Sequence, residues 1–184
     1  RGSWYGCSHI GEREMPPDMQ SDIMDWDYTT YSPHHFGVIW ASPPCTEYSM
    51  AKTAGVREIE EANKISQQTQ YWIIENPKNG KLKEQEFMAE LPFKDVDYCK
   101  YGMPYRKRTR LWNLVECWGP RPLCQKDCDS MSDNRRRHKE TAQRRPLDGR
   151  EGRRFRREEL YKVPESLISK IFRYIINHNN NPNQ

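Results

Sequence analysis

Two short strings in this 184-residue chain carry side chains that can do covalent chemistry on a heterocyclic base. Ser42-Pro43-Pro44-Cys45 supplies a thiol, and Glu75-Asn76-Pro77 supplies a carboxyl group. A thiolate can attack such a base while a carboxylic acid protonates it, provided that both groups reach the same place. The two strings therefore predict nucleophilic catalysis on a ring if the fold brings them together.

Each string directly follows an apolar run that predicts a buried strand. The runs are Phe36–Ala41 and Tyr71–Ile74. Between them, Arg57–Gln70 has helical composition without Gly or Pro and would form the crossover that parallel strands need. Because parallel strands deliver the loops that follow them to one edge of the sheet, we expect the thiol and the carboxyl group to meet there.

A third string, Arg106-Lys107-Arg108-Thr109-Arg110, follows a further candidate strand, Val96–Lys100. A strand at Thr109–Leu114 is also predicted, and alternation would then point Arg106, Arg108 and Arg110 to one face. These arginines could stabilise an anion at the same sheet edge. The alternative is a basic edge strand with solvated arginines.

The remaining elements complete a strand–helix alternation. Leu82–Leu91 predicts a helix that stops before Pro92. Val163-Pro164-Glu165 opens a last amphipathic helix, with Pro164 in its first turn. The apolar residues of that helix recur at helical spacing: Leu167, Ile168, Ile171, Phe172 and Ile175. Loops at strand ends and alternating elements are typical of a doubly wound α/β sheet.

With these strings in this order, the chain resembles the cytosine-5 DNA methyltransferases. In that family a Pro-Cys loop, a Glu-Asn-Val loop and a Gln-x-Arg-x-Arg string follow one another. The resemblance runs from about Asp22 to Phe172, and this chain departs from it with Pro77 in place of Val. It implies a Rossmann-like sheet that uses S-adenosyl-L-methionine and a compact member of phage or virus type.

The resemblance also implies a role for each motif residue. Cys45 would add to carbon 6 of a cytosine turned out of the DNA duplex, and Glu75 would be the proton donor at ring nitrogen 3. Arg110 would contact the cytosine oxygen, and Arg108 would brace the catalytic loop or a phosphate. Pro44 would shape the loop beside the cofactor.

On the cofactor side the resemblance is less complete. Asp22-Ile23 matches the motif in which an acid meets the adenine amino group and an apolar neighbour covers the ring. The Phe-x-Gly-x-Gly loop that opens the family domain has no clear counterpart after Arg1. The expectation is therefore a sheet that is truncated at its N-terminal side. Two alternatives follow: an inactive remnant that binds nucleic acid or a partner, and the same chemistry on tRNA.

A basic segment is predicted to hold the DNA backbone. From Arg135 to Arg157 there are eleven Lys or Arg and three acidic residues, a local charge of +8 in a chain whose net charge is +4. In the family, the region between the arginine string and the last helix reads the target. The residues expected to contact nucleic acid, chiefly its phosphates, are Arg106, Arg135, Arg136, Arg137, Arg153 and Arg154. The alternative is a solvated charge run.

Six cysteines are too few and too irregularly spaced for a disulfide scaffold. Four soft ligands could instead hold a tetrahedral zinc ion that anchors the core-poor segment. The candidate ligands are Cys99, Cys124, Cys128 and His138. Free structural thiols are the alternative, because no Cys-x-x-Cys pair is present.

Length and composition limit the number of domains and the cellular location. A chain of this size holds one domain with a small appendage. We divide it into a catalytic part at residues 1–112 and 162–176, a target-recognition segment at 113–161, and a disordered tail at 177–184. No run approaches 18 apolar residues and no signal-peptide core opens the chain, which predicts an intracellular protein of the cytoplasm, nucleoid or nucleus.

Overall fold

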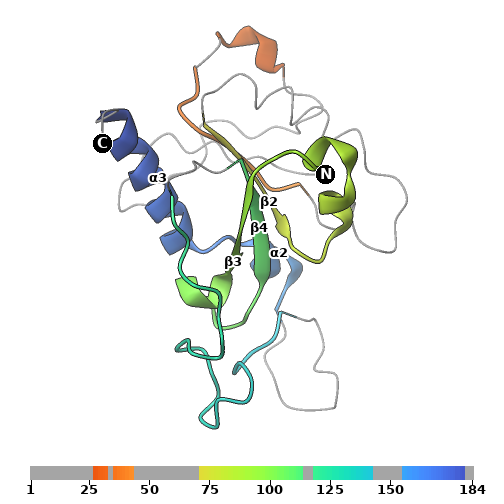
Figure 1. The fold of residues 1–184 in the computed structure, drawn as a ribbon, viewed down its shortest axis with the longest axis vertical. Coiled ribbons are helices and arrows are strands. Elements are labelled where there is room, and N and C mark those ends of the chain that lie inside the picture. The colour runs from red at the N-terminus through yellow and green to blue at the C-terminus, as the bar shows by residue number, and fades with distance from the viewer. Residues whose placement is uncertain (1–26, 33–34, 44–70, 114–117, 143–154, 181–184) are drawn as a thin grey trace. The chain divides into compact units, whose positions relative to one another are not determined.

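A computed structural model describes residues 27–32, 35–43, 71–113, 118–142 and 155–180. The described elements are short strands, 3₁₀ turns and helices, and they include a four-stranded sheet in the order β1-β2-β4-β3 (Figure 1). This confirms the predicted mixed α/β class. In chain order the elements are η1 (Tyr28–Thr30), β1 (Ile39–Ala41), β2 (Trp72–Pro77), η2 (Lys81–Glu84), η3 (Glu86–Met88), β3 (Phe93–Asp97), η4 (Tyr98–Tyr101), β4 (Arg108–Trp112), α2 (Arg157–Tyr161) and α3 (Glu165–Asn180).

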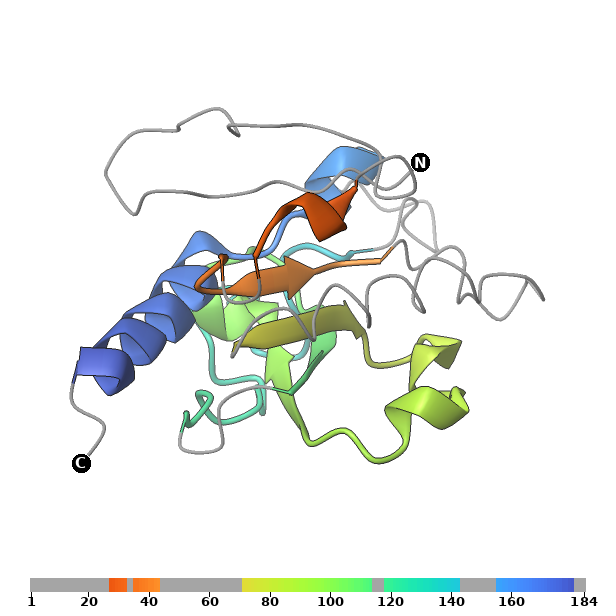
Figure 2. The ribbon, with the colours of Figure 1, turned by 90° about the horizontal axis from the view of Figure 1, so that it is seen from above.

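Strands β1 and β2 run parallel and side by side, as Figure 2 shows. Their register places Ile39 opposite Trp72 and Ala41 opposite Ile74. Both strands lie where the apolar runs predicted them, although β1 is shorter than Phe36–Ala41. Strand β2 continues through Pro77, so that the Glu-Asn-Pro string forms its last three residues and not the loop after it. The predicted crossover helix, Arg57–Gln70, lies outside the described residues.

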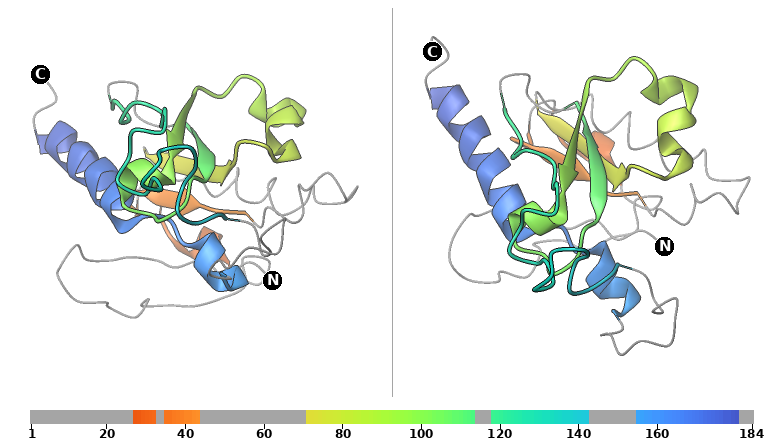
Figure 3. Two further views of the ribbon diagram at one scale, coloured as in Figure 1. Left: turned by 90° about the horizontal axis from the view of Figure 1, so that it is seen from below. Right: turned by 60° about the horizontal axis from the view of Figure 1, so that its bottom comes forward.

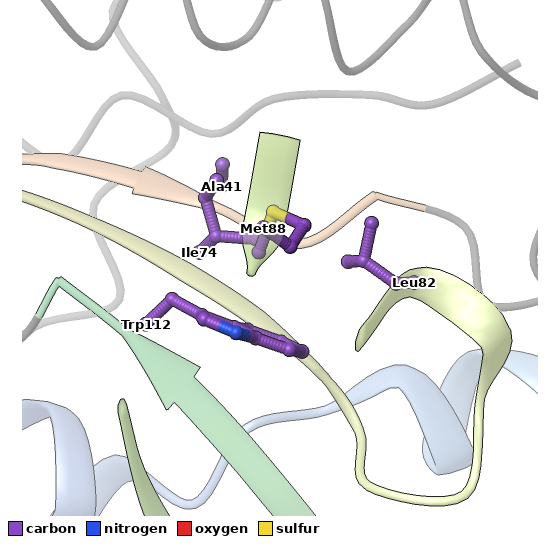
Figure 4. Close-up of a cluster of buried hydrophobic side chains, with 5 residues drawn as sticks. All are labelled: Ala41, Ile74, Leu82, Met88 and Trp112. Carbon is purple, nitrogen blue, oxygen red and sulfur yellow. The ribbon is translucent and has the colours of Figure 1, made fainter. Parts of the chain in front are cut away.

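A compact apolar cluster fixes this strand pair. Figure 4 shows side chains from β1, β2, β4, η2 and η3 gathered together. Its members are between 0% and 4% exposed: Ala41, Ile74, Leu82, Met88 and Trp112. Burying a Leu or Met side chain of this kind contributes about 1.5–3 kcal/mol. The cluster therefore holds the strands whose ends carry the two motif strings.

The predicted single helix over Leu82–Leu91 is wrong. The structure has two 3₁₀ turns, η2 and η3, separated at Gln85, whose backbone is extended (φ −75°, ψ 138°). Leu82 and Met88 are six residues apart, which on one α-helix would set them about 120° apart around the helix axis. Both enter the same apolar cluster. The break at Gln85 allows this, because it reorients the second turn.

The two later strands begin earlier than predicted. Strand β3 covers Phe93–Asp97, where Val96–Lys100 was expected, and η4 takes up the rest of that segment. Gly102 ends η4 in the left-handed conformation (φ 95°), which glycine adopts without a steric cost. Strand β4 agrees with the predicted Thr109–Leu114 to within two residues.

The last helix, α3, forms where the sequence predicts it. Leu167, Ile171 and Ile175 are buried at 0–2% exposure, and Ser166 Oγ donates to the Tyr101 carbonyl at 2.7 Å. The helix continues to Asn180, four residues into the predicted tail. Among the described residues no helix is long and apolar enough to cross a membrane.

The chain divides into two compact units. The first comprises Arg1–Phe93 and Leu111–Val115, and the second comprises Lys94–Arg110 and Glu116–Gln184. Strand β4 contributes to both, because Leu111 and Trp112 belong to the first unit. The second unit thus holds Lys94–Arg110 and α3 together with the Cys- and Arg-rich segment. The division into a catalytic part, a target-recognition segment and a tail stays a prediction.

Candidate active site and cysteine cluster

A buried hydrogen bond joins the two motif strings in the first unit. The Asn76 side-chain Nδ2 donates to the carbonyl oxygen of Pro43 at 2.9 Å. Asn76 is fully buried, and Pro43 is two residues before Cys45. With Ala41 opposite Ile74 in a parallel pair, the chain leaves both strands at the same end. The structure thus brings Ser42 and Pro43 to the same sheet edge as the Glu-Asn-Pro residues.

The candidate proton donor is held inside the protein. Glu75 lies in β2 and is only 4% exposed. Next to it, the side-chain Oδ1 of Asn76 has no hydrogen-bond partner among the described residues. A buried polar atom without a partner costs about 1–3 kcal/mol. The Asn76 Oδ1 atom could therefore accept a hydrogen bond from a polar group that binds at this end of β2.

Four predicted residues cannot be placed. Cys45, Pro44, Asp22 and Ile23 lie outside the described part of the chain. Their assigned roles stay predictions that rest on the motifs.

In the second unit, each arginine of the Arg-x-Arg string makes a bidentate ion pair with an aspartate of β3. Arg108 contacts Asp97 through Nε–Oδ1 at 3.0 Å and Nη2–Oδ2 at 2.8 Å. Arg110 contacts Asp95 through Nε–Oδ1 at 2.8 Å and Nη2–Oδ2 at 3.3 Å. Bidentate pairs fix the plane of a guanidinium as well as its position. Both arginines are therefore oriented by the protein itself.

Our sequence analysis missed the two aspartates. The signal was present in the spacing, because Asp95 and Asp97 are two residues apart in the sequence just as Arg108 and Arg110 are. Opposite charges at the same period on neighbouring strands favour cross-strand pairs. Arg106, by contrast, precedes β4 and is exposed.

Asp97 is the residue of this network whose loss should cost most. Its carboxylate is buried and accepts hydrogen bonds from Arg108 and from the Cys124 backbone N–H at 2.9 Å. Asp97→Asn should lower the free energy of unfolding by about 2–3 kcal/mol in a denaturant titration, because Arg108 loses its buried partner. Asp127→Asn is the control, since Asp127 is 53% exposed in its pair with Lys100 and should cost less than about 1 kcal/mol. Equal losses in the two variants would contradict a special role for Asp97.

The second unit also gathers the four candidate metal ligands. One side-chain ligand atom of each lies within 4.8 Å of all the others, in the set Cys99, Cys124, Cys128 and His138. Cys99 comes from η4, and the other three come from the 118–142 segment that Figure 3 shows folded against η4. The His138 Nε2 lies 3.3 Å from the Cys128 Sγ and 3.5 Å from the Cys124 Sγ. All three cysteines are buried.

The protonation behaviour of this cluster follows from its crowding. Burial, together with the neighbouring Cys124 and Cys128, raises the pKa of the Cys99 thiol far above its ordinary value. Burial also lowers the pKa of His138, and the positive charge of Arg106 adds to the effect. A low pKa keeps the imidazole neutral, which is the form that binds metals.

The predicted nucleic-acid residues other than Arg106 fall into two groups. Arg135, Arg136 and Arg137 lie together and exposed in the 118–142 segment. Arg153 and Arg154 lie outside the described residues. The described residues of the basic segment are 135–142 and 155–157, and the exposed trio lies in the first of these stretches.

The sequence predicts an α/β sheet for a methyltransferase, with the two motif strings at one edge. The structure has a four-stranded sheet in which Asn76 of one string is hydrogen-bonded to Pro43 of the other. No family model matches the chain. The chain is, however, 33% identical over 182 residues to a "Probable DNA (cytosine-5)-methyltransferase" of Frog virus 3 (isolate Goorha). That alignment covers 84% of this chain and 83% of the relative. The chain belongs to the DNA (cytosine-5)-methyltransferase family.

Proposed function

We propose that this protein transfers a methyl group from S-adenosyl-L-methionine to carbon 5 of cytosine in DNA through a covalent adduct with Cys45. The observation that carries the proposal is the hydrogen bond from Asn76 to Pro43, which ties the strand end bearing Glu75 to the string bearing Cys45. Nucleophile and acid must act on one ring, and this bond joins the segments that carry them.

The proposed reaction uses both side chains twice. The Cys45 thiolate adds to carbon 6 while Glu75 gives a proton to ring nitrogen 3, which leaves carbon 5 electron-rich. Carbon 5 would then take the methyl group from the sulfonium of S-adenosyl-L-methionine, which would leave as S-adenosyl-L-homocysteine. A solvent base then takes the carbon 5 proton, the electrons of that bond form the carbon 5–carbon 6 double bond, and the Cys45 thiolate leaves. The nitrogen 3 proton returns to Glu75.

Arg108 and Arg110 would supply positive charge close to the reacting base. Their pairs with Asp97 and Asp95 hold each guanidinium in a fixed plane before any substrate binds. Preorganised donors of this kind stabilise charge without reorganising during the reaction. In this proposal Arg110 contacts the cytosine oxygen, and Arg108 braces the catalytic loop or a phosphate.

The cofactor would bind at the edge where β1 and β2 end, in a Rossmann-like sheet. In open α/β sheets, ligands bind outside the carboxyl ends of the strands. The buried Asn76 Oδ1, unpartnered among the described residues, fits a polar ligand or loop at that edge. Asp22, Ile23 and Pro44 are the residues that we expect to hold S-adenosyl-L-methionine.

The DNA would present its target as a flipped cytosine, because a base inside the duplex cannot reach a buried carboxyl group. Glu75 is buried at 4% exposure, so the base must enter the protein. The exposed arginines at 135–137 would contact phosphates, and each such contact contributes affinity without reading sequence.

Methyl transfer from labelled S-adenosyl-L-methionine to random-sequence duplex DNA and to tRNA tests the proposal. Label in 5-methylcytosine after DNA hydrolysis is the expected result, with little in tRNA. Label confined to tRNA would replace DNA as the substrate. Binding of DNA without transfer to either polymer would show an inactive family member.

A further inference from the structure

We infer that Cys99, Cys124, Cys128 and His138 bind one zinc ion, and that this ion fixes a hairpin whose arginine tip contacts the DNA backbone. The metal centre follows from side-chain geometry alone. The DNA contact rests on the proposed function. Nothing in the methyl-transfer chemistry requires the four ligands, so the site is separate from Cys45 and Glu75.

The distances match a closed tetrahedral site. With zinc–sulfur bonds of about 2.3 Å and a zinc–nitrogen bond of about 2.05 Å, tetrahedral angles place sulfur and nitrogen ligands about 3.5 Å apart and two sulfurs about 3.8 Å apart. The two Sγ–Nε2 distances are 3.5 Å and 3.3 Å, and all four ligand atoms lie within 4.8 Å of one another. A single ion at the centre would reach each ligand with small adjustments.

The ligand set selects the metal. Three thiolates and one imidazole in a tetrahedron favour zinc over magnesium or calcium, which prefer oxygen ligands. Zinc binds cysteine as the thiolate and histidine as the neutral imidazole. Four protein ligands leave no open position for water, so a structural role is expected and not a catalytic one.

An ordered turn separates two of the proposed ligands, Cys124 and Cys128. Cys124 and Cys128 flank a turn in which Lys126 adopts the left-handed conformation (φ 69°), uncommon for a residue with a side chain. Asp127 in that turn accepts from the Gln125 N–H at 3.0 Å and pairs with Lys100, the neighbour of Cys99, at 2.7 Å. The turn is therefore tied to η4 beside the cluster.

The hairpin extends from the last two ligands. Met131 and His138 form an antiparallel bridge, the Lys139 N–H donates to the Ser130 carbonyl at 2.8 Å, and the Ser132 N–H donates to the Arg137 carbonyl at 2.9 Å. Cys128 and His138 thus lie at its base.

Three consecutive exposed arginines, Arg135, Arg136 and Arg137, lie at the other end of this hairpin. Arg135 is in the left-handed region (φ 49°), and the Arg136 N–H donates to the Asn134 Oδ1 at 3.1 Å. This ordered turn projects positive charge to solvent, as phosphate contacts require.

The cluster is also connected to the arginine string. The Oδ2 atom of Asp97 accepts from the Cys124 N–H at 2.9 Å and from Arg108 Nη2 at 2.8 Å. Ordering Cys124 on a metal would therefore hold Asp97, and through it the guanidinium of Arg108. The metal centre would thus position Arg108 through Cys124 and Asp97.

The metal centre is tested on the full chain by elemental analysis and by cobalt(II) substitution. About one equivalent of zinc is expected, and the cobalt form should show thiolate-to-metal charge transfer with the intense visible bands of a tetrahedral ion. Cys128→Ser and His138→Ala should lose the metal. His138→Cys should retain it, because a fourth thiolate completes the site.

Cys45→Ser is the matched control, since Cys45 is not one of the four proposed ligands and the variant should keep a full equivalent of zinc. A metal-free wild-type chain, or equal zinc loss in Cys45→Ser and Cys128→Ser, would overturn the site. Neither readout depends on methyl transfer, so the site can fail while the proposed function holds.

The hairpin is tested by hydrogen exchange and by DNA binding. With zinc, the amides of Ser132 and Lys139 should be protected, and His138→Ala should lose that protection while His138→Cys keeps it. The triple variant Arg135→Gln, Arg136→Gln, Arg137→Gln should keep its zinc. Its slope of log affinity against log salt should be shallower by about 3, because three arginines no longer neutralise a phosphate.

The zinc-depleted wild-type chain should bind DNA with the same shallower slope as the triple variant. An unchanged slope after zinc removal would overturn the link between the ion and the hairpin. If the zinc-loaded chain binds no DNA, the hairpin's role in DNA binding is wrong together with the proposed substrate, while the metal centre is retained.

Discussion

Replacing Cys45 by serine is expected to abolish methyl transfer, with a loss of roughly 10⁴-fold or more in rate, and to leave DNA affinity within about twofold. A cysteine thiol has a pKa of about 8.5 and is partly ionised near neutral pH, whereas a serine hydroxyl is scarcely ionised at all. Serine also keeps the size of the side chain. The effect should therefore fall on the addition to carbon 6 and not on the fold.

The measurement is incorporation of labelled methyl groups into duplex DNA, with DNA binding followed in parallel. Cys117→Ser is the control, because Cys117 belongs neither to the motif strings nor to the proposed metal ligands. It should retain most of the activity. Retained turnover in Cys45→Ser would remove Cys45 from its proposed role, and a parallel loss of DNA binding would point to a structural role.

Glu75→Gln should produce the second largest effect, a fall of about 10²–10⁴-fold in kcat. Glutamine keeps the shape of the side chain but has no acidic proton to give to ring nitrogen 3. Because Glu75 is 4% exposed in β2, a replacement of equal size preserves the packing. The melting temperature should therefore change little while the chemical step slows.

Glu84→Gln provides the matched control, since Glu84 is an exposed residue of η2 in the same unit. Its activity and melting temperature should equal those of the wild type. A Glu75→Gln variant that loses stability and activity together would indicate that the buried carboxyl group supports the fold. Unchanged kcat would exclude it as the proton donor.

The sequence was most informative where the hydrophobic pattern agrees with residues that begin or end an element, such as proline. The apolar run before Glu75 predicts β2 because a short run of buried β-branched and aromatic residues fits a strand. Pro164 at a helix start and the 3.6-residue spacing of Leu167, Ile171 and Ile175 predict α3 for the same kind of reason. These are local signals that tertiary contacts reinforce.

The sequence was less informative where distant contacts decide the conformation. The composition of residues 82–91 predicts one helix, but the structure has two 3₁₀ turns. With this break, Leu82 and Met88 both pack in one apolar cluster. The Asn76–Pro43 bond joins residues 33 positions apart, which no local pattern predicts.

The cysteine cluster could be predicted from the sequence only in part. Its ligand types were visible in the sequence, but their irregular spacing also allowed free structural thiols. Only the fold brings Cys99 to within 4.8 Å of ligands from the 118–142 segment.

Trapping of the covalent intermediate tests the central claim most directly. Duplex DNA made with 5-fluorocytosine in place of cytosine has no proton to lose at carbon 5, so the sulfur–carbon 6 bond cannot break after methyl transfer. We expect a complex that survives denaturation, forms only with S-adenosyl-L-methionine present, and carries the modified base on the peptide containing Cys45. The absence of such a complex, or attachment at a cysteine other than Cys45, would contradict the account.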